Sequence, residues 1–540
     1  MSLPLALTGQ VSHSFDFSTH VFFASHYQRN WWSLWEPRWF EGFDVSSYPP
    51  LTHQLAALLG LLVGNESSVS ALTCLAVVVY PVAVFELVRP YFGARTALTA
   101  ASVAVVTPSV LLGGYAFGQL PTLFALDAGL FAAAALSQVV RQGGLARGAL
   151  VVSLVGVVAA AHHATAIFFL APLLGTVAIA ELARARKARQ VLTRLLPLVL
   201  STSAAVLLVI LPFWVWHATE YVSQVPIDHQ SRHNLLQDPV AQLLFFWSEH
   251  GVLAAALLLA LPALWRNARQ VACWYALGAF LLVVSLGGTT PLPRLLFGSQ
   301  WAWLTYDRFA LWADVPLSIL LAVAATRSLG LDAPGRRGPR VAWTLTLVAL
   351  GGFGVVDALL PAIIQTEPAP IDPRPIVAFL NADDNSNWRY LTLGFGDQTG
   401  ILNSEMSAGT LDGEYFTARR LPYLTQSGIA QLDFSRYSDP QATTLRAVLA
   451  DPAPHSLRWV FTREPDYAAL LATSGWQQQT MLANGIEVWE PRRLPPPVVP
   501  VPPRTDLLAV WWGTVPLLTL ASLIPIGYWV RRPASAVVTA

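Results

Sequence analysis

The sequence predicts a mainly α-helical, polytopic membrane protein that carries one small α+β domain. Of its 540 residues, 54% are hydrophobic and only 12% are charged, and the mean hydropathy is +0.49. A soluble globular chain carries about 25% charged residues. Apolar runs of spanning length recur from residue 69 onward, whereas a polar stretch over 362–505 mixes strand-like and helix-like patterns. These observations favour a bundle of membrane helices with a water-exposed domain.

About eleven apolar runs are long enough, allowing for tilt, to span a bilayer. They lie near 69–88, 97–113, 119–139, 147–161, 163–183, 195–216, 250–265, 271–287, 309–327, 341–361 and 506–530. The fourth and fifth runs are short for two crossings and meet at His162 and His163. One broken or tilted helix is the alternative there.

Short basic loops predict the orientation, because Lys and Arg accumulate on the cytoplasmic side. The strongest such loop lies over 184–194, and two arginines follow the last run at 531–532. This predicts a multi-pass protein of the plasma (inner) membrane with a cytoplasmic C-terminus. Residues 1–68 then lie outside, provided that 51–64 rests on the outer leaflet as an interfacial helix. An outer N-terminus needs a helix to deliver it, so we interpret residues 3–9 as the remnant of a preceding one.

Four parts follow from this topology. They are an extracytoplasmic first loop with interfacial helices (1–68), a transmembrane helical domain (69–361), an extracytoplasmic α+β domain with a Pro-rich linker (362–505), and a C-terminal transmembrane helix with a cytoplasmic tail (506–540). In the α+β domain, alternation predicts strands over 388–396, 457–464 and 485–490, and helical spacing predicts helices over 374–382, 441–450 and 466–474.

Composition also narrows the partners. A net charge of +1 offers no broad basic surface, so we expect no nucleic acid. Cys74 and Cys273 both lie inside apolar runs, and we expect neither a disulfide nor a metal site from them. The lipid bilayer is the partner that composition predicts.

The first loop holds the most reactive pattern. Asp16 and His20 stand four residues apart, so on a helix they share one face, where an imidazole can orient or polarise a carboxylate. Apolar and hydroxyl neighbours can lift the pKa of Asp16 toward the range of a general base. We predict both residues to be catalytic. The structural alternatives are a helix-capping aspartate and an interfacial imidazole.

Six further residues are predicted to bind substrate. Arg308 stands at the outer end of an apolar run, where a guanidinium can grip a phosphate through two hydrogen bonds; snorkelling toward headgroups is the alternative. His162 and His163 sit at a helix break, where unpaired polar groups are costly, so we expect them to line a cavity or pair with loops. The remaining three are Glu36, Tyr48 and His53, with Glu36 also explicable as part of a surface turn.

Two other patterns concern metal and membrane. His229 and His233 are spaced to ligate a metal on a helix, yet exposed loop clusters of this kind are more often simply solvated. We therefore predict no metal ligands. Four tryptophans between residues 31 and 39 predict an aromatic belt at headgroup depth, where amphipathic rings settle.

The first loop also resembles the GT-C superfamily of membrane glycosyltransferases. The likeness is carried by Asp16, by His20, by WEPRW at 35–39, by Gly42 and Phe43, and by YPPL at 48–51. Within that superfamily the chain is most similar to the 6-pyruvoyl-tetrahydropterin-synthase-related membrane proteins, through NWRYLTLGFGDQ at 387–398 and DGEY at 412–415. It departs at Phe17, which follows Asp16 where many relatives carry an acidic pair.

This resemblance implies a GT-C-like fold and a glycosyltransferase. The implied reaction moves a sugar from a polyprenyl-phosphate-linked donor to an extracytoplasmic glycan, lipid or protein acceptor, with inversion at the anomeric carbon and Asp16 as general base. No cofactor is implied, and the missing acidic pair leaves a divalent metal unsupported. The alternatives are a polytopic transporter of lipid or polysaccharide and a non-catalytic membrane scaffold. The sequence disfavours a transporter, because its ionisable residues crowd the loops.

Overall fold

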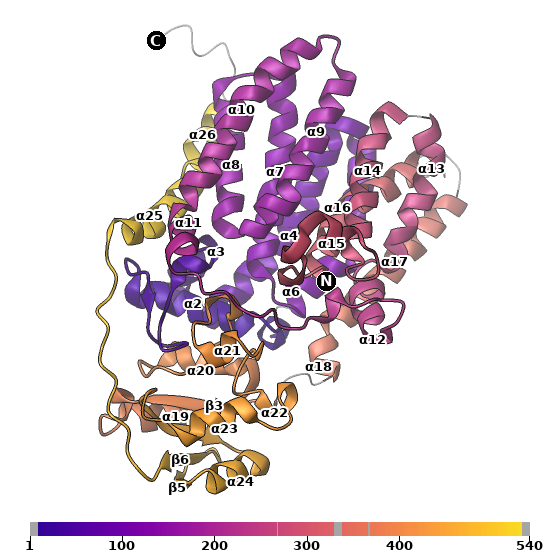
Figure 1. Cartoon of the computed structure of the whole chain (residues 1–540). Helices are drawn as coiled ribbons and strands as arrows, with labels where there is room; N and C mark the ends of the chain where they lie inside the picture. The colour runs from indigo at the N-terminus through magenta and orange to yellow at the C-terminus, as the bar shows by residue number, and fades with distance from the viewer. Residues whose placement is uncertain (1–8, 267, 329–336, 365–367, 532–540) are drawn as a thin grey trace.

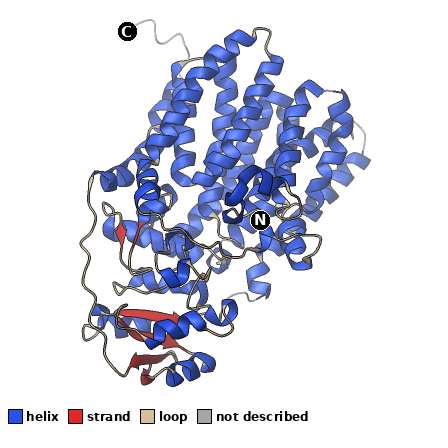
Figure 2. Ribbon diagram, in the orientation of Figure 1, coloured by secondary structure: helices blue, strands red, loops and turns tan. Residues whose placement is uncertain are grey.

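The computed structural model describes residues 9–266, 268–328, 337–364 and 368–531. A bundle of long helices forms one end of the molecule, and a small sheet with its helices forms the other (Figures 1 and 2). The N-terminal helices α2 and α3 lie between the bundle and the sheet domain (Figure 1). Residues 3–8 of the predicted N-terminal remnant, and the tail after 531, fall outside the described residues.

Within the described residues, eight helical segments are long and apolar enough to cross a membrane. They are α4 (Asn65–Phe92), α7 (Leu120–Gln142), a π-helical turn continued by α9 (Thr165–Arg184), α10 (Ala188–Val209), α14 (Ala268–Ser285), α16 (Asp307–Val323) with its continuation to Arg327, α17 (Gly338–Ala358), and α25 (Leu507–Ala521) continued by α26 (Leu523–Arg531). The predicted polytopic helical fold is confirmed.

The other three predicted runs are shorter or bent. α5 (Ala94–Ala104) and α6 (Pro108–Tyr115) meet at an angle of 43°, because a proline begins α6 and holds the preceding Thr107 extended. Short apolar helices occupy Leu145–Ala161 (α8) and Leu253–Arg266, which includes α13 (Ala256–Arg266).

The chain reverses direction between α8 and α9. His162 adopts an extended conformation after α8, and α9 returns to the end of the bundle where α8 began, since Arg141 at the end of α7 bonds Glu181 of α9. α8 and α9 are therefore two separate helices joined by a break, and the alternative of one broken helix does not hold.

Shorter helices complete the bundle and the first loop. They are α2 (Phe17–Asn30), α3 (Leu51–Val63), α11 (Leu211–Thr219), α12 (Pro239–Gln242), α15 (Leu292–Phe297) and α18 (Leu360–Ile364). β1 (Trp35–Glu36) pairs antiparallel with β2 (Phe43–Asp44) between α2 and α3. The second half of α3 exposes Leu58, Leu61 and Leu62, an apolar surface of the kind an interfacial helix needs.

The sheet domain has four strands in the order β3-β4-β6-β5. β3 (Arg389–Leu393) is parallel to β4 (Leu457–Thr462), and β6 (Glu487–Pro491) pairs antiparallel with both β4 and β5 (Trp476–Met481). The accompanying helices are α19 (Arg374–Asn381), α20 (Thr399–Glu405), α21 (Pro422–Thr425), α22 (Ser435–Ser438), α23 (Thr443–Ala450) and α24 (Pro465–Thr473). All three predicted strands and all three predicted helices are present.

β5 is the strand that the sequence did not predict. After Trp476 its residues are all exposed, and three are glutamines, so no apolar alternation marks them. β5 lies at the edge of the sheet, where a strand gains its pairing from one neighbour without burying a face.

The first loop is a folded unit that holds the sheet domain. Trp39 is fully buried, its ring stacked 3.5 Å from that of Phe22, and its indole N–H donates to Asn403 of α20. The predicted aromatic belt is therefore wrong for Trp39, because a neighbouring domain supplies the apolar and polar partners that a headgroup layer would otherwise offer. Trp32 remains 49% exposed.

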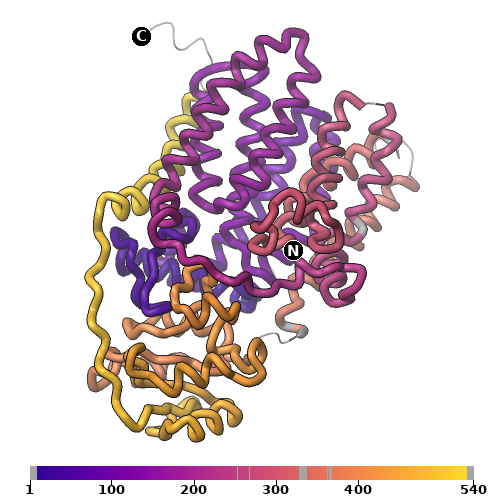
Figure 3. Tube along the Cα trace, in the orientation of Figure 1, coloured from indigo at the N-terminus to yellow at the C-terminus, as the bar shows by residue number. Residues whose placement is uncertain are grey.

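The Pro-rich linker returns from the sheet domain to α25 along the side of the molecule (Figure 3). Arg504 at its end bonds Asp44 at 2.9 Å and Glu220 at 2.5 Å. The linker is thus tied to the first loop and to the chain that follows α11.

Ionisable residues also lie inside the bundle, which corrects the expectation that they crowd the loops. His250 Nδ1 is 2.9 Å from Asp314 Oδ1, and Asp314 accepts a further bond from Ser109 at 2.6 Å. His250 and Asp314 are both fully buried. Each group of this cluster has a partner, so the cluster joins α6 and α16. Asp127 of α7 and Glu249 differ, because each keeps a buried carboxylate oxygen with no partner among the described residues.

Candidate active site at the start of helix α2

Asp16 stands at the first turn of α2 with a free carboxylate. It occupies the N-cap position but makes no capping hydrogen bond, and among the described residues no group donates to its side chain. Burial raises its pKa to about 6, against the lowering effect of the nearby Arg308 guanidinium, while Asp307 adds to the rise. The capping alternative therefore fails, and the carboxylate is left available for other chemistry.

The turn between α6 and α7 positions Asp16. The backbone N–H of Asp16 donates to Phe117 O at 3.1 Å, and Gly118 follows with a φ of +74°. A Cβ on Gly118 would lie 2.6 Å from Ser14 Oγ and 3.1 Å from the Asp16 nitrogen. The close approach and the positive φ together require glycine at this position.

The same turn also positions Arg308. Gln119 Nε2 donates to Asp307 Oδ2 at 2.5 Å, which ties the turn to the first residue of α16. Arg308 Nη1 donates to Thr305 at 2.7 Å, while its Nε is buried with no partner among the described residues. One short turn thus brings the carboxylate of Asp16 and a partly free guanidinium into the same region.

Two tyrosines face this region from different domains. Tyr48 precedes α3, and Tyr415 comes from the sheet domain; their rings lie 4.5 Å apart. Burial raises the pKa of Tyr48, and the charge of Asp16 raises it further. Burial also raises the pKa of Tyr415, whereas the positive charge of Arg308 lowers it. Asp16, Arg308 and both tyrosines therefore share one electrostatic environment.

His20 pairs with His53 instead of Asp16. His20 Nδ1 is 3.0 Å from His53 Nε2, and His20 Nε2 is 2.8 Å from Gly118 O. Both ring nitrogens are occupied, so the predicted imidazole–carboxylate contact within α2 is not formed. Both rings are almost fully buried. His53, predicted from α3, is brought next to His20, and its ring lies 5.1 Å from that of Tyr48 at an angle of 42°.

His162 and His163 have different surroundings. His162 Nδ1 accepts from the Thr165 hydroxyl at 2.7 Å and from the Thr165 backbone N–H at 3.3 Å. The ring hydrogen is therefore on Nε2. The charges of Arg308 and His20 both act on His162, which places it beside the Asp16 region. His163 packs 4.4 Å from the ring of Phe213, on the side of α11 and α25. The predicted pair is split by the break after α8.

Glu36 is held in a buried ion network. Its carboxylate accepts from Arg38 at 2.5 Å and lies 2.8 Å from His26 Nδ1. Although burial acts to raise it, these partners hold the pKa of Glu36 below its usual value. Arg38 also donates to Asn403 O of the sheet domain. Contrary to what the sequence suggested, Glu36 therefore lies neither in a surface turn nor where it could bind substrate. Both of its carboxylate oxygens are bonded within the protein, and it stabilises the contact with the sheet domain.

Glu414 joins the sheet domain to the start of α2. Its Oε2 accepts from Ser18 at 2.6 Å and from Thr19 at 2.9 Å, and its Oε1 accepts from Thr399 at 2.9 Å and from the Gly400 amide at 2.6 Å. Burial raises its pKa to about 8 against these four bonds. The sequence analysis did not predict Glu414 or Tyr415 as site residues. The only sequence feature that points to them is the DGEY motif at 412–415, which contains both.

His229 and His233, which are spaced like metal ligands, bind different partners. His229 Nδ1 accepts from Ser231, and His233 pairs with Asp238 at 2.7 Å and with Asp228 at 3.1 Å. Among the residues the structure describes, no group of three or more His, Cys, Asp or Glu side chains is arranged to hold a metal ion. His229 instead lies near Asp307, whose charge acts on it.

A cavity of ≈ 630 Å³ opens beside this region, between the first loop and the sheet domain. Ser14, Phe17 and Ser18 line it from the α2 side, and Gln398 and Ile401 line it from the α20 side. Pockets of this size at a domain interface are common positions for small-molecule binding. Ser14 and Phe17, which line the cavity, flank Asp16 in the chain, whereas Asp16 itself is not one of the lining residues.

The fold is similar to that of solved membrane proteins, although no curated protein sequence matches the chain. ArnT from Cupriavidus metallidurans in the apo state aligns with a TM-score of 0.53 and 12% identity, over 90% of this chain and 97% of ArnT. The same protein bound to undecaprenyl phosphate aligns with a TM-score of 0.52 and 13% identity, over 92% and 98% of the two chains. The arabinofuranosyltransferase AftD from Mycobacteria aligns with a TM-score of 0.53 and 16% identity, over 91% of this chain and 39% of AftD.

These likenesses confirm the predicted GT-C-like fold. A protein-family model matches residues 6–388 of the sequence. This range includes the first loop, α16 and the start of the sheet domain. The chain belongs to this family, which is described as a family of unknown function (DUF6541).

Proposed function

We propose that the protein is a membrane glycosyltransferase. It transfers a sugar from a polyprenyl-phosphate-linked donor to a hydroxyl of an extracytoplasmic glycan, lipid or protein, and it inverts the anomeric carbon. One observation carries this proposal: the Asp16 carboxylate has no protein partner, has a pKa of about 6, and lies in the field of a partly unpaired Arg308. A free base beside a free cation suits a reaction that takes a proton from one substrate and releases a phosphate from the other.

The proposed reaction is a single displacement. Asp16 accepts the proton of the acceptor hydroxyl as its oxygen attacks the anomeric carbon, and the bond between that carbon and the donor phosphate oxygen breaks. The electron pair of that bond leaves with the polyprenyl phosphate. With a pKa of about 6, Asp16 is mostly ionised at pH 7 and still basic enough to take the proton.

Arg308 is proposed to hold the donor phosphate. Its unpaired Nε and remaining Nη2 can bind two phosphate oxygens, the geometry for which a guanidinium is suited. His162, whose Nε2 carries a hydrogen, is a second donor on the same side. The ArnT structure with undecaprenyl phosphate supports a lipid phosphate as ligand of this fold.

The acceptor is proposed to approach through the cavity between the first loop and the sheet domain. This assignment puts both of them on the extracytoplasmic side. It agrees with the position of the basic 184–194 segment, which lies at the opposite end of the bundle (Figure 1). The narrower resemblance to the 6-pyruvoyl-tetrahydropterin-synthase-related membrane proteins remains part of this proposal.

The test is transfer by the full chain, purified in lipid nanodiscs, with a panel of undecaprenyl-phosphate-linked hexoses and pentoses. Release of undecaprenyl phosphate is measured for the wild type, Asp16→Asn and the control Asp228→Asn, whose carboxylate is exposed. We expect Asp16→Asn to lose roughly 10²- to 10⁴-fold in rate and the control to keep its rate. Equal rates in all three proteins would remove Asp16 from the mechanism.

The same preparation separates the enzyme from its alternatives. In sealed vesicles, a transporter moves a labelled lipid-linked sugar between leaflets without releasing lipid phosphate, and a scaffold does neither. Movement without release, in the presence of acceptor, would favour a transporter.

A further inference from the structure

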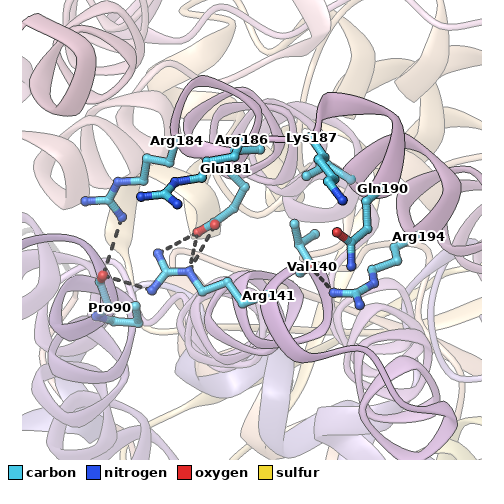
Figure 4. A pocket seen from close by; sticks show the side chains of 11 residues that line it. Pro90, Val140, Arg141, Glu181, Arg184, Arg186, Lys187, Gln190 and Arg194 are labelled. Carbon is cyan, nitrogen blue, oxygen red and sulfur yellow. Dashed lines mark hydrogen bonds and ion pairs between the residues drawn. The ribbon is translucent and has the colours of Figure 1, made fainter.

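A second pocket, of ≈ 620 Å³, lies at the end of the helix bundle away from the sheet domain (Figure 1), and Figure 4 shows the side chains that line it. It is formed where α7 and α9 end and α10 begins. Five basic side chains and one carboxylate line it, which leaves a formal charge of +4: Arg141, Arg184, Arg186, Lys187, Arg194 and Glu181. Such a concentration of positive charge in a hollow strongly favours an anion.

Two of the arginines are already fixed as walls of the pocket. Arg141 Nη2 bonds Glu181 at 2.7 Å, and its Nη1 donates to Pro90 O at 3.1 Å. Arg184 donates to Tyr91 O at 2.7 Å. The carboxylate of Glu181 is therefore neutralised by Arg141. The positive charges of the other four basic side chains remain uncompensated within the pocket.

The other three basic residues keep donors available. Lys187 and Gln190 project into the hollow in Figure 4. Arg194 uses one nitrogen on Val140 O, at 2.6 Å, and leaves its other nitrogens free. The side chains of Arg186 and Lys187 are exposed, and neither forms a hydrogen bond with a described residue. These groups can together bind several phosphate oxygens.

The surroundings favour a lipid over a soluble anion. α10 forms one wall of the pocket, and further along this helix Leu192, Leu196 and Leu200 are 53%, 65% and 64% exposed. An apolar, exposed helix that begins at a basic hollow provides a surface for acyl chains beside a site for their headgroup. Basic loop residues that serve only to set orientation need not converge, whereas here Arg141 and Arg194 come from two different helices.

We propose that this pocket binds the phosphate-bearing headgroup of an anionic membrane lipid. A lipid with two phosphate groups fits the charge of +4 better than one with a single phosphate. The pocket is separate from the Asp16 region, so binding there does not depend on the proposed transfer reaction. Only the assignment of the lipid to the cytoplasmic leaflet rests on the proposed orientation.

The test measures cardiolipin retention by the full chain in phosphatidylcholine nanodiscs, by native mass spectrometry across a cardiolipin titration. The variant is Arg186→Gln with Lys187→Gln, both exposed side chains whose loss leaves the fold intact. The matched control is Arg266→Gln with Arg269→Gln, which removes the same charge from another exposed basic pair. Inorganic pyrophosphate is titrated in parallel as the soluble counterpart.

We expect the pocket variant to bind cardiolipin roughly 10- to 30-fold more weakly, and the control to change less than about twofold. Wild-type binding should also weaken as salt is raised. Equal retention by both variants would overturn the proposal. Tight pyrophosphate binding without cardiolipin retention would overturn the lipid and leave a soluble diphosphate as the ligand.

Discussion

His20 Nδ1 and His53 Nε2 lie 3.0 Å apart, with a carbonyl oxygen at the far side of each ring. Gly118 O is 2.8 Å from His20 Nε2, and Pro49 O is 3.2 Å from His53 Nδ1. Three contacts require three hydrogens, but two neutral imidazoles carry only two. Burial lowers the pKa of His20 to about 4 and lowers that of His53 as well, so the pair is neutral at pH 7. We infer that the contact without a hydrogen is the longest one, between His53 Nδ1 and Pro49 O.

This buried pair predicts a loss of stability in acid. His20 binds a proton more weakly in the folded chain than in the unfolded chain. Its contribution to the free energy of unfolding is therefore complete above about pH 6.5 and is lost as the pH falls toward 4. A shift of this size corresponds to about 3 kcal/mol. The melting temperature of the purified chain between pH 7 and 4.5 checks it. His20→Gln should flatten the pH dependence, whereas His13→Gln, at an exposed position, should leave it unchanged; equal slopes would contradict the prediction.

The proposed transfer rate should rise with pH through about 6 and then level off. Asp16 must be ionised to accept a proton, and its pKa of about 6 sets the midpoint. Rates measured from pH 5 to 8 with saturating donor check this. A rate that is flat across pH 6 would mean that another group is the base.

Arg308→Gln should move that midpoint upward as well as slow the reaction. The guanidinium lowers the pKa of Asp16, so its removal lets burial raise that pKa further. The pH profile of the variant is compared with that of Arg294→Gln, whose guanidinium lies over the ring of Trp301. A loss of rate with an unmoved midpoint would show that Arg308 acts on the donor alone.

Glu414 predicts weaker docking of the sheet domain at high pH. Its pKa of about 8 lies above the usual value of 4.5, so the folded state favours the protonated acid. The stabilising contribution is therefore complete below about pH 4.5 and is lost as the pH rises through 8. Limited proteolysis of the linker between pH 6 and 9 measures the docking. Glu414→Gln cannot ionise and should remove the pH dependence, and Glu66→Gln serves as the exposed control.

Gly118→Ala should destabilise the protein and slow the proposed reaction. The added Cβ would meet Ser14 and the backbone of Asp16, and a positive φ costs an alanine roughly 1–2 kcal/mol by itself. Melting temperature and transfer rate are measured beside Gly113→Ala, where an added Cβ meets nothing within 4 Å. Similar behaviour of the two variants would show that the turn adapts without moving Asp16.

Periodicity and composition predicted the spanning helices and most of the sheet domain, because burial in lipid or in a core leaves a repeating apolar pattern. They failed at β5, an edge strand without a buried face, and at Trp39, whose indole is buried by another domain. In both cases the deciding neighbour is distant in the sequence.

Local sequence marked Asp16 as reactive, through its apolar and hydroxyl neighbours, but it assigned His20 to the wrong partner. Spacing along one helix shows which side chains share a face, whereas hydrogen bonding is decided by whatever lies opposite that face. For His20 that is Gly118 and His53.

The sequence by itself determined that this chain crosses a membrane repeatedly, that it carries a separate α+β domain, and that Asp16 and Arg308 are groups suited to chemistry. Only the tertiary structure decided that the charge of Arg308 acts on Asp16, that Glu36 is neutralised by Arg38, and that Glu414 and Tyr415 enter the same region. The physical reason is that hydropathy is a property of each segment, whereas the field at a carboxylate depends on charges that folding brings to it from remote parts of the chain.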